Sequence, residues 1–202
     1  MEKFGFKENM NSTKKLAILA SGSGSNAEKI IQYFKSNKEI EIVGILTNNE
    51  NAGVTARAEK AGIAYHVFSK SEFEDGAPVL HFLKSHEVDV VVLAGFLLKI
   101  SPKITAQYPD RIINIHPALL PKYGGKGMYG HYVHEAVINN QETESGITIH
   151  LVNDEYDEGE IIFQAKCSIH PQMGSKQLSA KVQQLEHQHY PKVIEDFVGK
   201  LD

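Results

Sequence analysis

Short apolar segments alternate with amphipathic segments along most of the chain. The apolar segments have the length and composition of strands, and the segments between them carry apolar residues about one helical turn apart. The segment 88–94 is nearly continuous valine and leucine, as expected for a strand that is buried on both faces. The pattern predicts five strands, at 16–20, 40–46, 64–68, 88–94 and 111–115.

Helices are predicted between these strands, at 27–35, 54–61, 78–86 and 101–107. Ile30, Ile31 and Phe34 form the apolar face of the first helix, and Gly62 ends the second. Proline stands near the first position of the other two, where a helix needs no backbone N–H. Strands that alternate with helices predict βαβ units, a parallel sheet and right-handed crossovers.

The last third of the chain has a different pattern. A glycine-rich loop, a helix, two strands joined by an acidic turn and a long helix follow one another, at 123–130, 131–139, 146–152, 160–168 and 175–198. We expect the long helix to be broken or kinked near Pro191, because proline removes a backbone donor inside a helix.

The fold class that these patterns predict is α/β, in a single Rossmann-like domain. Its sheet is mostly parallel and flanked by helices, with an antiparallel edge near the C-terminus. No repeat or linker divides the chain. We therefore expect a flexible N-terminal extension over 1–14 and one domain over 15–202.

Composition narrows the function classes. The 202 residues carry a net charge of −4, which argues against a general nucleic-acid binder. Cys167 is the single cysteine, so an intrachain disulfide is excluded, and we interpret it as a small buried hydrophobe in a reducing compartment. No apolar run approaches the ~18 residues of a membrane span, and the polar N-terminus lacks a signal core. The expected location is the cytoplasm.

A glycine-rich turn links the first strand to the first helix, with the sequence Ser-Gly-Ser-Gly-Ser-Asn over 21–26. Glycines let the backbone approach a ligand, and a helix N-terminus offers free N–H groups to an anion. The turn matches neither a Walker loop nor the dinucleotide motif, because Ala27 occupies the final glycine position. Taken alone, it is equally a phosphate site or a tight turn capped by Ser25 or Asn26.

Asn114 and His116 are two residues apart at the end of a predicted strand, so their side chains project to the same side. An amide beside an imidazole can stabilise an oxyanion and move a proton. A histidine satisfied at a strand end is the plainer alternative. Farther along, the segment 153–160 holds five acidic residues, which is more typical of a solvated turn, but a carboxylate from it could orient His116.

The remaining histidines carry weaker signals. His131, His134 and Glu135 have the order His-x-x-His-Glu, which is not the order of the zinc proteases, and we predict no metal. His150 lies in a predicted strand and could face Asp157 behind the catalytic groups, although a histidine of the core or the sheet edge fits the pattern nearly as well.

Together these motifs resemble the phosphoribosylglycinamide formyltransferase family. The resemblance rests on the 21–26 turn, Leu-Ala-Gly-Phe at 93–96, Asn-Ile-His-Pro at 114–117 with Leu-Leu-Pro at 119–121, and Asp-Glu-Tyr-Asp at 154–157. It covers nearly the whole chain. It implies that a formyl group passes from 10-formyltetrahydrofolate, as co-substrate, to glycinamide ribonucleotide in purine biosynthesis.

The resemblance also implies roles for individual residues. It implies that Asn114, His116 and Asp157 are catalytic. It also implies that Gly24, Ser25 and Asn26 bind the substrate phosphate. The folate-binding residues that it implies are Leu97, Leu98, Lys99, Ile100, Asn114, Asn153 and Asp154. Gln183 and Glu186 would reach the ribonucleotide. The family often has a basic residue where this chain has Leu98.

In the mechanism that we expect, a protonated His116 stabilises the oxyanion of a tetrahedral intermediate and Asn114 is the second donor. Asp157 keeps the imidazole charged and helps to move the amine proton through water.

Other functions stay open: a tRNA or sugar formyltransferase, a formyltetrahydrofolate hydrolase, or a nucleotide-binding module without activity. By the same resemblance, the tRNA-acting relative carries a further C-terminal domain and the hydrolase an N-terminal one, and this chain has room for neither. The expected partners are small molecules, with no nucleic acid and no membrane, and a homodimer is left open.

Overall fold

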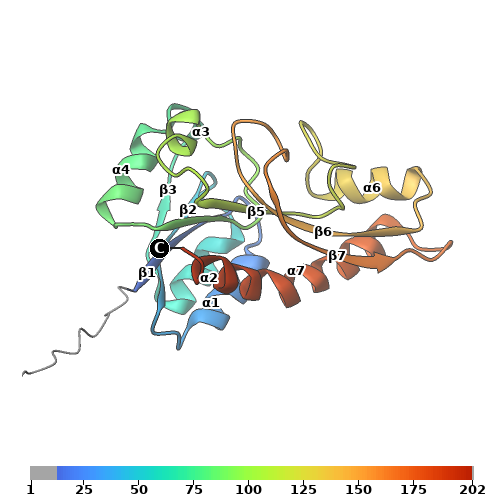
Figure 1. The fold of residues 1–202 in the computed structure, drawn as a ribbon, viewed down its shortest axis with the longest axis horizontal. Helices are drawn as coiled ribbons and strands as arrows, with labels where there is room; N and C mark the ends of the chain where they lie inside the picture. Colours follow the sequence, from blue (N-terminus) through green and yellow to red (C-terminus); the bar gives the residue numbers. More distant parts are fainter. Residues whose placement is uncertain (1–12, 202) are drawn as a thin grey trace, which may run out of the picture.

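The computed structural model describes residues 13–201, and these contain a seven-stranded sheet with the order β3-β2-β1-β4-β5-β6-β7 (Figure 1). The strands in chain order are β1 (Lys14–Leu19), β2 (Ile40–Thr47), β3 (Tyr65–Val67), β4 (Val90–Leu93), β5 (Ile112–His116), β6 (Glu144–Leu151) and β7 (Ile161–Ser168). The first five pair in parallel, whereas β6 and β7 are antiparallel. This arrangement confirms the predicted fold class.

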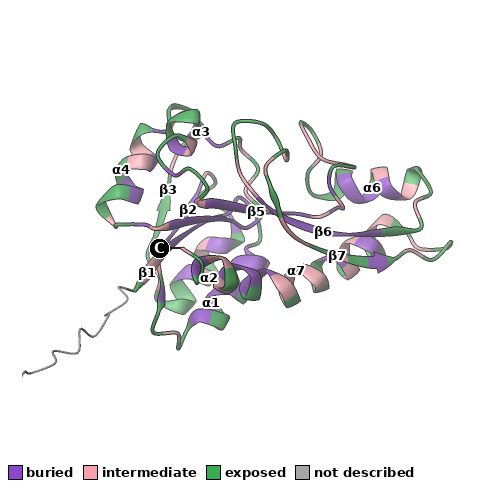
Figure 2. Cartoon of the chain, viewed as in Figure 1, coloured by how far each residue is buried: buried purple, intermediate pink, exposed green. Residues whose placement is uncertain are grey.

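Helices cover both faces of the sheet. One face packs against α1 (Ser25–Phe34), α2 (Gly53–Ala61), α6 (His131–Asn139) and α7 (Ser175–Val198). The other face packs against α3 (Lys70–Asp75), α4 (Ala77–Ser85) and α5 (Pro102–Thr105). The central strands are buried on both sides, as the continuous apolar segment of β4 predicts (Figure 2).

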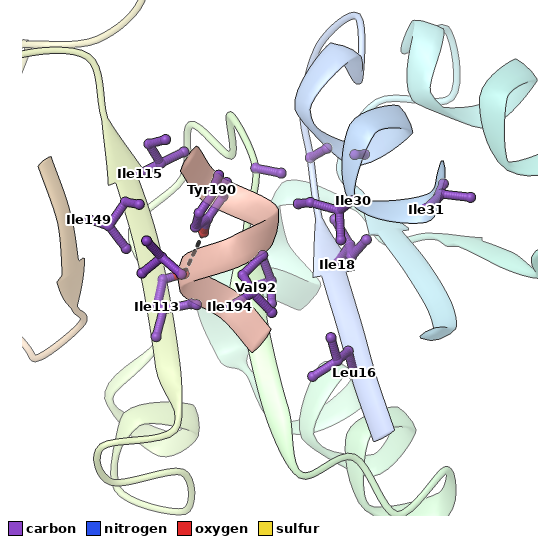
Figure 3. Close-up of a cluster of buried hydrophobic side chains, with 14 of the residues drawn as sticks. Leu16, Ile18, Ile30, Ile31, Val92, Ile113, Ile115, Ile149, Tyr190 and Ile194 are labelled. Carbon is purple, nitrogen blue, oxygen red and sulfur yellow. Dashed lines mark hydrogen bonds between the residues drawn. The ribbon is translucent and has the colours of Figure 1, made fainter. Parts of the chain in front are cut away.

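Helix α7 continues through Pro191 as one helix, so the predicted alternative of a break is wrong. Pro191 and Tyr190 are both buried, and Ile194 is buried one turn further on. Apolar burial on either side of the proline therefore offsets the missing backbone bond. Tyr190 also donates its hydroxyl to the carbonyl oxygens of Leu93 and Ile113, at 2.9 and 3.2 Å, so α7 is fixed to two central strands. Figure 3 shows the bond to Ile113.

Two smaller differences concern element boundaries. Helix α3 lies in a segment for which the sequence predicted no element, and the expected N-terminal extension over 1–14 mostly lies outside the described residues. Lys14 is already part of β1. Cys167 is a buried free thiol, as predicted. Within 13–201, no helix is both long and apolar enough to cross a membrane.

Candidate active site

A cavity of about 410 Å³ opens at the carboxyl ends of β1, β4 and β5. Neighbouring strands β1 and β4 are followed by connections that run to opposite ends of the strand order, so this is the topological switch point at which open α/β sheets bind ligands. The turn after β1, the segment after β4, the end of β5 and the inner face of α7 all contribute to its lining.

The glycine turn leads directly into α1 at one wall of the cavity. Gly24 is the residue before the helix, with φ of +74°, and no side chain caps the helix N-terminus. A Cβ on Gly24 would lie 2.7 Å from Val54, so the position needs glycine both for its backbone and for space. The free N–H groups at this end of α1 are therefore available to an anion. Gly24, Ser25 and Asn26, the residues predicted to bind the substrate phosphate, all line the cavity.

Asn114 and His116 come from β5 and line the same cavity. His150 stands directly opposite Asn114 on the antiparallel strand β6. The Nδ1 atom of His150 lies 2.7 Å from the Leu151 carbonyl oxygen and therefore carries the proton, which leaves its Nε2 to accept from the Asn114 amide at 3.1 Å. His150 thus orients Asn114.

Asp157 comes from the acidic turn between β6 and β7 and reaches both histidines. Its two carboxylate oxygens lie 3.6 Å from His116 Nδ1 and 3.6 Å from His150 Nε2. The Gly125 N–H donates to the same carboxylate at 2.9 Å. The turn therefore places Asp157 beside His116, and the interpretation that the segment more typically has, a solvated turn, does not hold at this residue.

The charge state of His116 differs from the one expected. Burial lowers the pKa of His116 below its ordinary value and outweighs the Asp157 carboxylate, which acts to raise it. Burial acts to raise the pKa of Asp157, but His150, His116 and the Gly125 N–H together bring that pKa below its usual range. The free site therefore favours a neutral imidazole beside an ionised carboxylate at neutral pH.

Helix α7 supplies part of the cavity wall. Gln183 donates to the Ser25 hydroxyl at 3.1 Å, and Glu186 accepts from the Asn26 amide at 2.8 Å. Both pairs link α7 to the glycine turn. Withdrawal from water raises the pKa of Glu186 to about 7, against a smaller lowering by Asn26. The Asn26 amide oxygen is buried and has no partner, so it is free to accept from a bound molecule.

The segment after β4 forms the far end of the cavity, where Leu97, Leu98, Lys99 and Ile100 all contribute to the lining. The Leu97 N–H donates to the Ser21 hydroxyl at 3.0 Å, which connects this segment to the glycine turn. Asn153 also lines the cavity. Asp154 does not, because its carboxylate accepts from the Thr105 hydroxyl at 2.6 Å outside the cavity.

Several lining residues were not among the predicted site residues. They include Tyr156, Ser179, Val182, His134 and part of the 125–131 segment. The signal for the 125–131 segment was a glycine-rich loop directly before a helix, which is the same pattern as the 21–26 turn. Within 13–201, no group of three or more histidine, cysteine or acidic side chains is arranged to hold a metal ion.

Comparison with known proteins identifies related chains. The formyl transferase family model matches residues 14–194. Phosphoribosylglycinamide formyltransferase of Escherichia coli (strain K12) is 37% identical over 192 residues, which cover 92% of this chain and 88% of that protein. The chloroplastic protein of the same name from Arabidopsis thaliana is 39% identical, and the match covers 90% of this chain and 64% of the plant protein. The crystal structure of phosphoribosylglycinamide formyltransferase from Bacillus halodurans superposes with a TM-score of 0.85 at 34% identity, over 94% of this chain and 97% of that one.

Proposed function

This chain belongs to the formyl transferase family, and from that premise we propose that it transfers the formyl group of 10-formyltetrahydrofolate to the amine of glycinamide ribonucleotide. The observation that carries the proposal is the meeting of Asn114, His116 and Asp157 in one cavity with the uncapped end of α1. An oxyanion donor, a titratable ring and a phosphate-sized anion site are the parts that this reaction needs.

Each substrate has a matching part of the cavity. The ribose phosphate would bind at Gly24, Ser25 and Asn26, where backbone donors are free. The ribonucleotide would also meet Gln183 and Glu186, which already contact that turn. The folate would occupy the end lined by 97–100 and Asn153, with its formyl group toward Asn114 and His116.

The transfer proceeds through a tetrahedral intermediate. The substrate amine attacks the formyl carbon, and the formyl oxygen becomes an oxyanion that accepts from the Asn114 amide. The negative charge that develops there offsets the burial that lowers the pKa of His116, so the ring becomes protonated as the intermediate forms. The amine proton leaves through water beside Asp157. A proton reaches folate N10 as the bond between the formyl carbon and N10 breaks, which releases tetrahydrofolate and the formylated amine.

The test is an assay of the purified protein with 10-formyltetrahydrofolate and glycinamide ribonucleotide, following loss of the formyl folate. We expect turnover that requires the ribonucleotide and depends weakly on salt. Release of formate at a comparable rate without any amine would favour a hydrolase. Formylation of charged initiator tRNA would favour the tRNA-acting relative. Either result would replace the proposed acceptor.

A further inference from the structure

Tyr123 contacts the catalytic histidine from outside the cavity lining. It lies in the connection between β5 and α6, and its carbonyl oxygen is 2.7 Å from His116 Nε2. A carbonyl oxygen can only accept, so Nε2 must carry a proton. When His116 is neutral, its lone pair is therefore on Nδ1, the atom that faces Asp157 at 3.6 Å. The backbone of Tyr123 thus decides which ring nitrogen is free to take up a proton.

The carbonyl is held in place through the side chain of the same residue. Tyr123 has φ of +59°, in the left-handed region that a bulky side chain rarely adopts without support. Its hydroxyl donates to the Glu142 carboxylate at 2.9 Å, and Lys122 donates to the same oxygen at 2.9 Å. A hydrogen bond to an ionised acceptor is among the stronger ones in proteins. The ring packs against the core cluster to which α7 contributes, so the residue is held through both its ring and its hydroxyl.

We propose that Tyr123 is a positioning residue for the formyl transfer. Its hydroxyl bond to Glu142 holds the carbonyl that keeps the His116 proton on Nε2 and makes Nδ1 the proton-accepting atom. The inference rests on the proposed function for its effect on turnover. Its effect on the ring itself is a property of the free protein and can be measured without substrate.

The other groups that face His116 do not supply this constraint. The Asp157 carboxylate acts to raise the pKa of His116 and His150 acts to lower it, whereas His116 in turn acts to lower the pKa of His134 on α6. Asp157 faces Nδ1, which leaves the Tyr123 carbonyl as the partner of Nε2. Loss of the carbonyl would therefore allow the proton to move to Nδ1, where it can bond Asp157. That tautomer presents a donor to the carboxylate and turns the basic nitrogen away from it.

Tyr123→Phe is the direct test, because it removes one oxygen and keeps the ring that packs against the core. Glu142→Ala removes the acceptor instead, at a partly exposed side chain, and serves if the first variant does not fold. Tyr33→Phe is the matched control, because the Tyr33 hydroxyl donates to Glu195 at 2.6 Å between α1 and α7, away from the cavity lining. Glu142→Gln keeps an acceptor for the Tyr123 hydroxyl, so it should recover the kcat that Glu142→Ala loses.

Two measurements separate positioning from general damage. ¹⁵N spectra of labelled histidine report which His116 nitrogen carries the proton, and steady-state kinetics report kcat and KM. We expect Tyr123→Phe and Glu142→Ala each to mix the two tautomers and to lower kcat about tenfold with both KM values unchanged, as for a loss confined to the transition state. The double variant should lose no more than either single one.

Wild-type spectra in both Tyr123→Phe and Glu142→Ala would overturn the proposal, and so would an equal loss in Tyr33→Phe. If the wild-type protein formylates no ribonucleotide, the proposed function fails by that result alone, and the spectra still decide whether Tyr123 fixes the ring.

Discussion

Asp157→Asn is the sharpest test of the electrostatics, because it removes one charge and keeps the shape of the side chain. An asparagine oxygen can still accept from the Gly125 N–H, so the turn should keep its conformation. What is lost is the attraction between a carboxylate and the His116 ring, whose Nδ1 lies 3.6 Å away. Both side chains are largely buried, at 5% and 13% exposure, so solvent screens the pair less than it would on the surface.

The size of the effect follows from that distance. Two unit charges 3.6 Å apart interact by about 4.6 kcal/mol at an effective dielectric constant of ~20. That energy is an upper limit on what the charge contributes, and its loss should lower the pKa of His116. Burial already lowers this pKa, so the change adds to an existing shift of the same sign. The imidazolium needed in the intermediate then becomes harder to form, and kcat should fall.

The measurement is an NMR titration of His116 in the wild type and in Asp157→Asn, with kcat followed over the same pH range. Glu158→Gln is the matched control, because Glu158 is exposed, adjoins Asp157 and lies outside the cavity lining. The control should leave the His116 titration unchanged. If Asp157→Asn also leaves it unchanged, the 3.6 Å pair does not act on the ring and the reasoning is wrong.

Three further outcomes are expected. His116→Ala should lower kcat by about 10²–10³ with little change in melting temperature, the usual cost of a lost transition-state stabiliser; normal turnover in the folded variant would refute its role. Gly24→Ala should destabilise the fold by ~1–3 kcal/mol in urea unfolding, because of its φ of +74° and the 2.7 Å approach to Val54, whereas Gly22→Ala, with nothing within 4 Å, should not. Glu186→Gln should raise the free energy of unfolding above pH 7. Folding raises the pKa of Glu186 to about 7, so the stability that the protonated carboxyl contributes is lost as pH rises from 4.5 to about 7. Thermal scans should therefore show that the variant gains about 1–3 kcal/mol at pH 8 and little at pH 4.5.

Much of the fold could be predicted because local patterns determine it. The bounds of α6 match the predicted 131–139, and β4 lies inside the apolar segment 88–94. Helix α3 was not predicted, although its sequence signal was present. Ser69 and Glu72 form a capping box, whose signature is a serine three residues before a glutamate. For α7, the rule that proline interrupts a helix did not hold where burial surrounds Pro191.

The site residues likewise include some that a local sequence pattern predicts and some that it does not. Asn114 and His116 could be paired from their spacing on one strand, because a strand alternates its side chains. The place of Asp157 depends on the registers of β5 with β6 and of β6 with β7, which are contacts between distant segments. The charge of His116 depends on burial by several elements at once. Neither the register nor the burial can be read from one segment of sequence.

The hydroxyl of Tyr190 has a consequence for how the cavity meets a ligand. It fixes α7 to the carbonyl of Ile113, the residue before Asn114, and Glu186 lies one helical turn before Tyr190 on the same helix. Contacts within the protein itself therefore align the groups on α7 with those on β5. The conformational entropy of aligning helix with strand is lost when the chain folds. A ligand that bridges the two elements finds them already matched, so more of its contact energy is available for affinity.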